Sequence, residues 1–156
     1  MKKILAKKIE MTQIFDETGE VFPVTLVMPI PSADQVAKSD NQEKEDLADM
    51  AEGDVVTVSG KSKGKGFQGV VKRHGFKGGR RSHGQKHSER EPGSIGGGGR
   101  AGGRVIKGMR MAGRMGNERV TIKNLKIIKI LPETHEIFIG GAIPGRRGSV
   151  VEIVTK

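Results

Sequence analysis

The stretch that decides the fold is a pair of apolar runs near the N-terminus, Ile4–Phe15 (ILAKKIEMTQIF) and Val21–Met28 (VFPVTLVM), separated by Asp16–Glu20 (DETGE). β-Branched and aromatic residues recur in both runs, as is typical of strands. The short polar segment between them contains a glycine, which can take the positive φ of a tight turn. The stretch therefore predicts a β-hairpin.

The rest of the chain outside its middle continues this pattern. Arg119–Leu131 predicts a long strand, and its apolar residues change parity after Ile122, which predicts a bulge or a bend. Pro132–His135 predicts a turn. Further short β-rich runs are Asp54–Ser59, Glu136–Ala142 and Val150–Val154. About six short strands with little helix predict an all-β fold, a small barrel or sandwich.

The segment Pro29–Gly53 differs from its flanks. It holds seven acidic residues and two lysines, and we interpret it as a polar connector with one or two helical turns near Gln42–Met50. No internal repeat is present in the sequence.

The composition excludes several classes of protein. The 156 residues include no Cys, Trp or Tyr and only five Phe. Without cysteine there is no disulfide framework, no thiol nucleophile and no cysteine-based zinc finger. No apolar run approaches the length of a membrane span or of a secretory signal, so we expect no membrane association and a cytoplasmic location.

Charge and glycine are concentrated in one segment, Ser59–Arg119. It holds sixteen of the 28 Lys and Arg residues, three of the 18 Asp and Glu residues and eighteen of the 24 glycines. Its net charge is +13, whereas that of the whole chain is +10, which predicts a polyanion as partner. Its twelve apolar residues are too few to offset the entropy of ordering the backbone, so we expect a loop, anchored by strands on both sides, that becomes ordered on its partner.

One motif in this segment is compatible with nucleotide binding. Gly64–Val71 matches the pattern G-x-G-x-x-G-x-V after a predicted strand. Val70–His87 is basic and interrupted by glycines, however, and predicts no helix, which a dinucleotide fold requires. A kinase needs aspartates downstream, and no Asp lies between Phe67 and Arg119. The spacing of Gly60–Gly66 also fails the Walker pattern.

The histidines suggest neither a metal site nor catalysis. His83 and His87 have the i, i+4 spacing of a helical metal pair, but Gly84 between them disfavours a helix. No nucleophile lies beside a histidine in a plausible scaffold. We therefore predict no metal, no cofactor, no small-molecule substrate and no enzymatic activity.

Nucleic acid is the partner that the basic segment favours. Arginine and lysine bind phosphate oxygens, glycine allows close approach of the backbone, and arginine or histidine can stack on unpaired bases. A free nucleic-acid chaperone or DNA-compacting protein would use the same residues. A small glycine-loop nucleotide enzyme is a third and weaker alternative.

Five ordered motifs resemble the large-subunit ribosomal protein three family. They are Lys7–Phe15 (KKIEMTQIF), Ser62–Phe76 (SKGKGFQGVVKRHGF), Pro92–Gly96 (PGSIG), Met111–Thr121 (MAGRMGNERVT) and Gly141–Gly145 (GAIPG). The resemblance implies a small translation-protein-type β-barrel on large-subunit ribosomal RNA, with a long extension directed toward the peptidyl transferase centre. It also implies a structural role in subunit assembly, with neighbouring large-subunit proteins as further partners.

These inferences define two domains and a set of binding residues. We expect a barrel domain of residues 1–58 and 120–156, interrupted by an RNA-binding extension of residues 59–119. The expected RNA-binding residues are Lys7, Lys8, Lys61, Lys63, Lys65, Lys72, Arg73, His74, Lys77, Arg80, Arg81, His83, Lys86, His87, Arg90, Arg100, Arg104, Lys107, Arg110, Arg114, Asn117 and Arg119.

The chain departs from the family pattern at several positions. Ala6 and Glu10 stand where the family usually has glycine. Gly97 follows the Pro92–Gly96 motif where some relatives carry glutamine, so modification of that glutamine is excluded here. Pro29–Gly53 is shorter than the corresponding part of relatives, which have further strands and a helical insertion there. This shortening raises the alternative of an incomplete or differently closed barrel.

Overall fold

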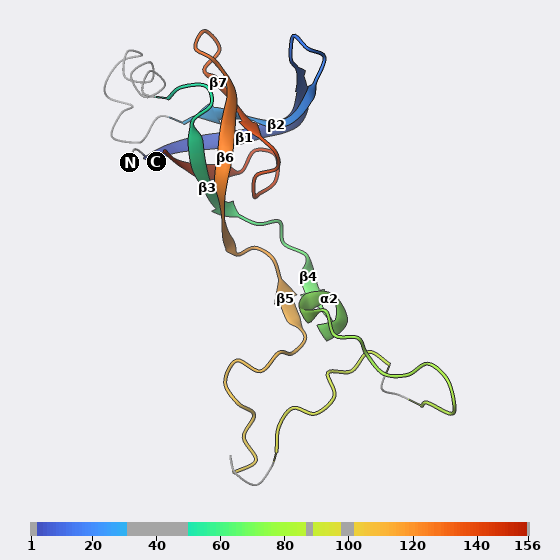
Figure 1. Ribbon diagram of the computed structural model, residues 1–156. Helices are drawn as coiled ribbons and strands as arrows, with labels where there is room; N and C mark the ends of the chain where they lie inside the picture. Colours follow the sequence, from blue (N-terminus) through green and yellow to red (C-terminus); the bar gives the residue numbers. More distant parts are fainter. Residues whose placement is uncertain (1–2, 31–49, 87–88, 98–101, 156) are drawn as a thin grey trace. The chain divides into compact units, whose positions relative to one another are not determined.

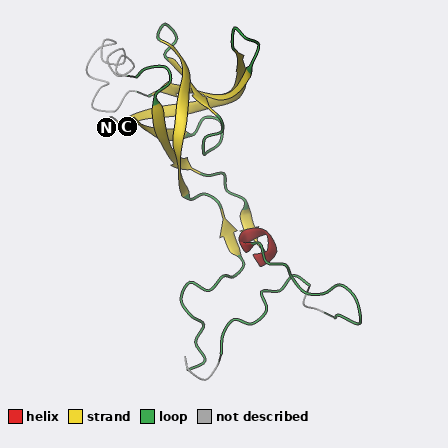
Figure 2. Cartoon of the chain, in the orientation of Figure 1, coloured by secondary structure: helices red, strands yellow, loops and turns green. Residues whose placement is uncertain are grey.

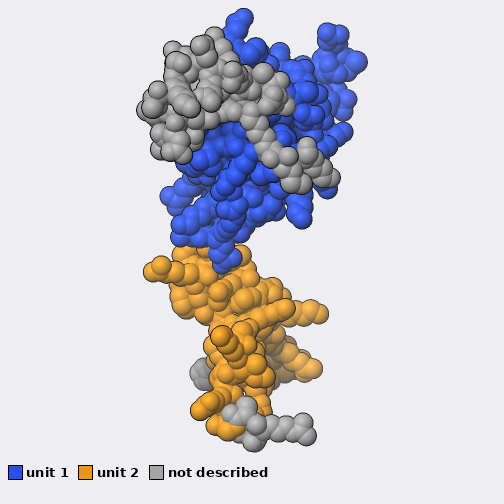
Figure 3. Space-filling view, turned by 90° about the vertical axis from the view of Figure 1, so that its left-hand side faces the viewer, with its two compact units in different colours: residues 1–63, 117–156 blue, residues 64–116 orange. Residues whose placement is uncertain are grey.

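The computed structural model describes residues 3–30, 50–86, 89–97 and 102–155 (Figure 1). Strands predominate in these ranges (Figure 2), and none of their helices has the length and apolarity needed to span a membrane. The chain divides into two compact units, Met1–Lys63 with Asn117–Lys156, and Gly64–Gly116 (Figure 3). The helical turns predicted near Gln42–Met50 lie outside the described residues, except for Met50 itself.

The first unit is a closed six-stranded barrel with the strand order β1-β2-β7-β6-β3-β8. Every neighbouring pair is antiparallel, including β1 with β8, which closes the circle. The strands are β1 (Lys3–Phe15), β2 (Val21–Pro29), β3 (Val55–Lys61), β6 (Arg119–Leu131), β7 (Glu136–Gly140) and β8 (Val150–Thr155). The predicted all-β barrel is confirmed, and the alternative of an incomplete barrel is wrong.

The hairpin of β1 and β2 is confirmed together with its turn. The Gly19 amide donates to the Asp16 carbonyl at 2.9 Å, and Gly19 has a φ of +82°. A side chain would be strained in this conformation, so glycine fits the turn. The register then runs from Phe15 opposite Val21 to Ala6 opposite Pro29, with an irregularity at Ile9.

The predicted change of parity in the long strand is a bulge in β6. Val56 pairs with Leu125 and Val58 with Ile122, so two residues of β6, Lys123 and Asn124, stand opposite one residue of β3. Asn124 has a φ of +59°, which asparagine tolerates better than most residues. The bulge lets apolar residues on both sides of it face the barrel interior.

Branched aliphatic side chains fill the barrel. The largest fully buried ones include Ile127, Ile137, Ile139 and Ile153. In a barrel of few strands the interior is only wide enough for side chains, and each buried one contributes about 1.5–3 kcal/mol. This explains how the chain forms a core with so few aromatic residues.

The strand predicted over Glu136–Ala142 ends earlier, at Gly140, because Gly141 turns the chain with a φ of +85°.

The second unit contains three short elements. They are the strands β4 (Gly66–Gln68) and β5 (Gly113–Met115) and the helix α2 (Val70–His74). The strands form a separate two-stranded sheet. The sequence did not predict these strands, and α2 corrects the expectation that no helix forms after Gly69.

On the outer face of the barrel, Glu152 of β8 contacts basic side chains of two other strands, Lys3 of the adjacent β1 and Arg119 of β6, which lies on the far side of β3. Its carboxylate accepts a hydrogen bond from Arg119 and lies 3.1 Å from the Lys3 ammonium. The hydrogen bond from Arg119, followed by that from Lys3, lowers the pKa of Glu152 below its usual value of 4.5. A lowered folded-state pKa adds stability above the unfolded value, and this contribution disappears as the pH falls through the folded one.

We therefore expect wild-type protein to unfold at a higher urea concentration than Glu152→Gln at neutral pH, with the difference closing as the pH falls below 4.5. The pair is exposed, so the effect is small. Urea titrations at several pH values measure it. Glu133→Gln, an exposed change in the turn after β6, is the control, and a difference that stays constant down to low pH contradicts the expectation.

Candidate nucleic-acid interface

The second unit begins and ends as two paired segments. Gly66 pairs with Met115 and Gln68 with Gly113, and the Lys65 amide donates to the Met115 carbonyl at 2.9 Å. In the first unit, the Ser62 amide donates to the Glu118 carbonyl at 2.9 Å just beyond the paired ends of β3 and β6. The segment therefore leaves and returns through hydrogen-bonded partners.

The helix α2 is a single turn whose end is set by glycine. Gly75 has a φ of +72°, and its amide donates to the Val71 carbonyl, which closes the turn. Val70 is its buried residue, and the last turn carries the basic residues Lys72, Arg73 and His74. Five residues are too few to support the nucleotide-binding interpretation of the preceding glycines, which needs a long packed helix.

Two side chains of α2 bind one backbone carbonyl. Arg73 Nη1 donates to the Met111 carbonyl at 2.7 Å, and His74 Nε2 lies 3.1 Å from the same oxygen. Gly113 makes room for this arrangement, because a Cβ there would lie 2.7 Å from Arg73 Nη1. Arg73 and His74, both half-buried, thus connect α2 to the segment that leads into β5.

Beyond α2, a loop closes on itself. The Gly79 amide donates to the Glu89 carbonyl at 3.0 Å, and Arg81 forms a 2.7 Å ion pair with the Glu89 carboxylate. Gly78 has a φ of +80°, and a Cβ there would clash with the Glu89 carbonyl oxygen. Glycine is therefore required where the two ends of the loop meet.

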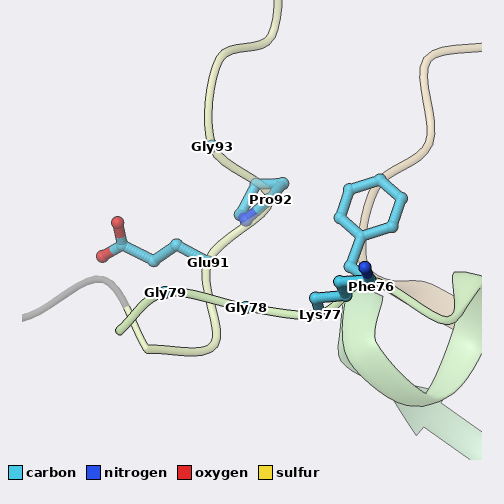
Figure 4. Close-up of a pocket in the computed structure, with 7 residues that line it drawn as sticks. All are labelled: Phe76, Lys77, Gly78, Gly79, Glu91, Pro92 and Gly93. Atoms are coloured by element: carbon cyan, nitrogen blue, oxygen red, sulfur yellow. The ribbon is translucent and has the colours of Figure 1, made fainter. Parts of the chain in front are cut away.

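An open hollow of about 440 Å³ lies beside this contact (Figure 4). It is lined by Phe76–Gly79 on one side and Glu91–Gly93 on the other. The rings of Phe76 and Pro92 lie on its border, and the Phe76 ring also contacts His74, with ring centroids 6.1 Å apart. The hollow therefore offers an aromatic ring, a proline ring and exposed backbone groups, together with the positive charge of Lys77 and the negative charge of Glu91.

Most of the predicted RNA-binding residues are exposed. Those with exposed side chains are Lys7, Lys61, Lys63, Lys65, Lys72, Lys77, Arg80, Arg81, His83, Lys86, Arg90, Arg104, Lys107, Arg110, Arg114, Asn117 and Arg119. Arg81 and Arg119 have acidic partners within the protein. His87 and Arg100 lie outside the described residues.

Lys8 is placed differently from the other predicted residues. It is buried in the barrel, and its ammonium donates to the carbonyls of Ile143 at 2.8 Å and Gly145 at 3.3 Å. Burial lowers the pKa of Lys8 below its usual 10.5, and the positive charge of Lys63 lowers it further. These bonds attach β1 to the loop between β7 and β8.

That loop, residues 141–149, is held to β1 by its backbone as well. The Gly148 amide donates to the Lys8 carbonyl at 2.7 Å, and the Lys8 amide donates to the Ser149 carbonyl at 2.9 Å. The loop carries two exposed arginines that the sequence analysis missed, Arg146 and Arg147. Arg147 forms a 2.8 Å ion pair with Glu10, whereas the structure describes no acidic partner for Arg146. The sequence signal that could have identified them is the pair of adjacent arginines directly after Gly145.

No metal centre is formed by the described part of the chain, which contains no group of three or more His, Cys, Asp or Glu residues placed to hold an ion. His83, with a φ of +59°, is exposed, and His87, which has the i, i+4 spacing to it, lies outside the described residues.

The fold and the charge distribution define a class: a small β-barrel protein with a cationic, glycine-rich insertion between two neighbouring strands. Residues 2–140 match the family model described as ribosomal protein L3. A curated relative, the large ribosomal subunit protein uL3 of Roseiflexus sp. (strain RS-1), is 39% identical over 200 aligned positions, which cover 96% of this chain and 95% of the relative.

The chain belongs to the ribosomal protein L3 family, and the resemblance seen in its motifs is confirmed. It is a structural constituent of the large subunit of the cytoplasmic ribosome, in a family that is not one of enzymes. Because the alignment runs over 200 positions and this chain has 156 residues, the relative contains segments with no counterpart here.

The bonds of Lys8 predict a local effect of its removal. Lys8→Met leaves the carbonyls of Ile143 and Gly145 without their donor, and a buried acceptor without a partner costs about 1–3 kcal/mol. We expect a lower free energy of unfolding and faster amide exchange at Gly148. Lys7→Met, a change at the exposed neighbour, should leave both unchanged. Equal effects of the two variants contradict this role of Lys8.

The space over Gly113 predicts a second local effect. Gly113→Ala places a methyl group against the Arg73 guanidinium and displaces it from the Met111 carbonyl. In ¹⁵N spectra of the arginine side chains, the Arg73 signal should move to the averaged position of exposed guanidinium groups. Gly69→Ala is the matched control, because nothing lies within 4 Å of a Cβ there. An unchanged Arg73 signal in Gly113→Ala contradicts the contact.

Proposed function

We propose that this protein binds large-subunit ribosomal RNA through its basic segment and supports folding and assembly of that RNA in the large subunit. In this proposal residues 1–58 and 120–156 form the barrel domain, and residues 59–119 form an RNA-binding extension directed toward the peptidyl transferase centre. The partners are ribosomal RNA and neighbouring large-subunit proteins.

The observation that carries the proposal is the excess of exposed cations without acidic partners. Between Gly64 and Gly116 the sequence holds thirteen Lys and Arg residues and only two acidic ones, Glu89 and Glu91. Of these acids, Glu89 is already paired with Arg81. Exposed cations on a glycine-rich backbone complement the charge of a phosphate chain, whose contacts dominate the affinity of nucleic-acid binding.

The predicted residues divide by what they do in this proposal. Exposed lysines such as Lys72 and Lys77 are free to bind phosphate oxygens. Arg73 and His74 hold α2 against Met111 and act as positioning residues, which set the direction in which Lys72 points. Lys8 has a structural role inside the barrel, where it binds backbone carbonyls. Arg146 is exposed and is added to the residues that we expect to bind phosphate.

The hollow at Phe76 supports RNA over a purely electrostatic polyanion. Unpaired bases stack on aromatic rings, and backbone groups beside a ring can hydrogen-bond the edge of a base. Phe76 borders the hollow with Lys77 next to it, so one base and its phosphate would find complementary groups there. Duplex DNA, whose bases are paired, gains nothing from such a place.

Binding by phosphate neutralisation predicts a strong dependence on salt. If the extension neutralises about 8 phosphates, the slope of log affinity against log salt concentration should be about −6 to −7. Titrations of a large-subunit RNA fragment with the full chain at several potassium concentrations measure it. Lys72→Gln should make the slope less steep by about 0.7–0.9, and a slope near zero contradicts the proposal.

Competition separates the proposal from the alternative of a free nucleic-acid chaperone or DNA-compacting protein. Structured ribosomal RNA should displace a bound RNA fragment at much lower concentration than duplex DNA does. Equal competition by duplex DNA favours the alternative. Phe76→Ala tests the stacking argument, since it should weaken RNA binding while leaving the salt slope unchanged.

A further inference from the structure

The far end of the β1–β2 hairpin carries an apolar face, and no other strand in the described part of the chain pairs with it. β8 pairs with β1 only as far as Lys7, and β7 pairs with β2 only between Val24 and Val27. The hairpin continues to its turn at Asp16 and extends past these neighbours (Figure 1). Among the described residues, the Pro23 carbonyl still accepts a hydrogen bond from the Gly141 amide at 2.8 Å, and beyond Pro23 the two strands of the hairpin pair with each other alone.

The register identifies which face this is. Lys8 and Val27 are opposite each other and buried, and after the irregularity at Ile9 the next inward pair is Met11 with the buried Thr25. Because side chains alternate along a strand, the same face continues with Gln13 and Phe15 on β1 and with Pro23 and Val21 on β2. The inner face of the barrel thus continues beyond the barrel.

The residues on this continued face are core-like but exposed. Phe15 is 62% exposed, Met11 51% and Val21 46%, and Pro23 is also exposed. Phe15 stands directly opposite Val21, so the two form one apolar contact surface rather than separate exposed residues. A contiguous exposed patch of this kind marks an interaction site.

The charge around the patch indicates which kind of partner covers it. Asp16, Glu17 and Glu20 form the turn, and the sequence contains no Lys or Arg between Lys8 and Lys38. RNA would be repelled here, and a second copy of this hairpin would bring the same negative charges together. A basic polypeptide complements both the charge and the apolar surface.

We infer that the distal inner face of the β1–β2 hairpin, formed by Met11, Gln13, Phe15, Val21 and Pro23, is a docking site for a basic segment of another large-subunit protein. This inference rests on the proposed function only in taking the assembled subunit as its setting. RNA binding by the extension is a separate property of the second unit. The partner contributes apolar side chains to the patch and lysine or arginine to the acidic turn.

Site-specific cross-linking tests the inference. The chain has no cysteine, so Gln13→Cys provides a single attachment point for a photoactivated cross-linker between Met11 and Phe15. Full-length protein carrying it is incorporated into large subunits and irradiated. A cross-link to a basic segment of another protein is expected. A cross-link to RNA, to a second copy of this chain or to nothing overturns the inference. Thr12→Cys, on the opposite face, is the matched control and should give much less of the same product.

A competition assay keeps this inference separate from the proposed function. Phe15→Ser with Val21→Thr should reduce incorporation into large subunits about tenfold against wild-type protein, which corresponds to about 1.4 kcal/mol. Its affinity for naked large-subunit RNA should not change. Val150→Thr, also at an exposed valine, is the control. If the double variant folds normally but loses its affinity for RNA, the docking role is contradicted. If the wild-type protein has no affinity for RNA, only the proposed function is contradicted.

Discussion

The antiparallel pairing of β3 with β6 is the constraint on which the rest of the structure depends. The two strands are neighbours in the barrel, with Lys61 opposite Arg119 at the ends where the chain leaves and returns. A closed barrel has no free edge, so an insertion between hydrogen-bonded neighbours does not interrupt the sheet. The barrel can therefore carry a long segment that has almost no core of its own, because both ends of that segment are fixed by the ladder.

This constraint explains why glycine and charge accumulate in one segment without weakening the fold. Inside the barrel, Val and Ile fill a narrow interior, and a charge such as that of Lys8 is accepted only where carbonyls bind it. In the second unit, the described contacts include the short β4–β5 ladder, the two bonds to the Met111 carbonyl and the hydrogen bond from Gly79 to Glu89. The cations between these contacts remain exposed, where phosphate groups can reach them.

An element of this structure could be predicted from the sequence where its run of residues is long enough to show a periodic pattern of apolar side chains. The six barrel strands were predictable because alternation over five or more residues, and the change of parity at Ile122, are visible in the residues themselves. β4, β5 and α2 have three to five residues each, too few to show a period, and their formation depends on contacts across a long sequence separation such as Arg73 with Met111. The buried position of Lys8 could have been predicted, because Ile4, Ala6 and Lys8 alternate on the inner face of the barrel. It was not predicted, because a lysine is normally exposed to solvent.

The same alternation links the buried lysine to the exposed apolar patch. The irregularity at Ile9 shifts the parity of β1, so that Met11, Gln13 and Phe15 follow Lys8 on one face. A regular strand would have placed Glu10 on the inner face, next to the buried ammonium. The bulge instead keeps Glu10 outside, where it pairs with Arg147, and allows the ammonium to bind the carbonyls of the loop between β7 and β8. One extra residue in β1 therefore both keeps the Glu10 carboxylate out of the barrel and places Met11, Gln13 and Phe15 on the continuation of its inner face.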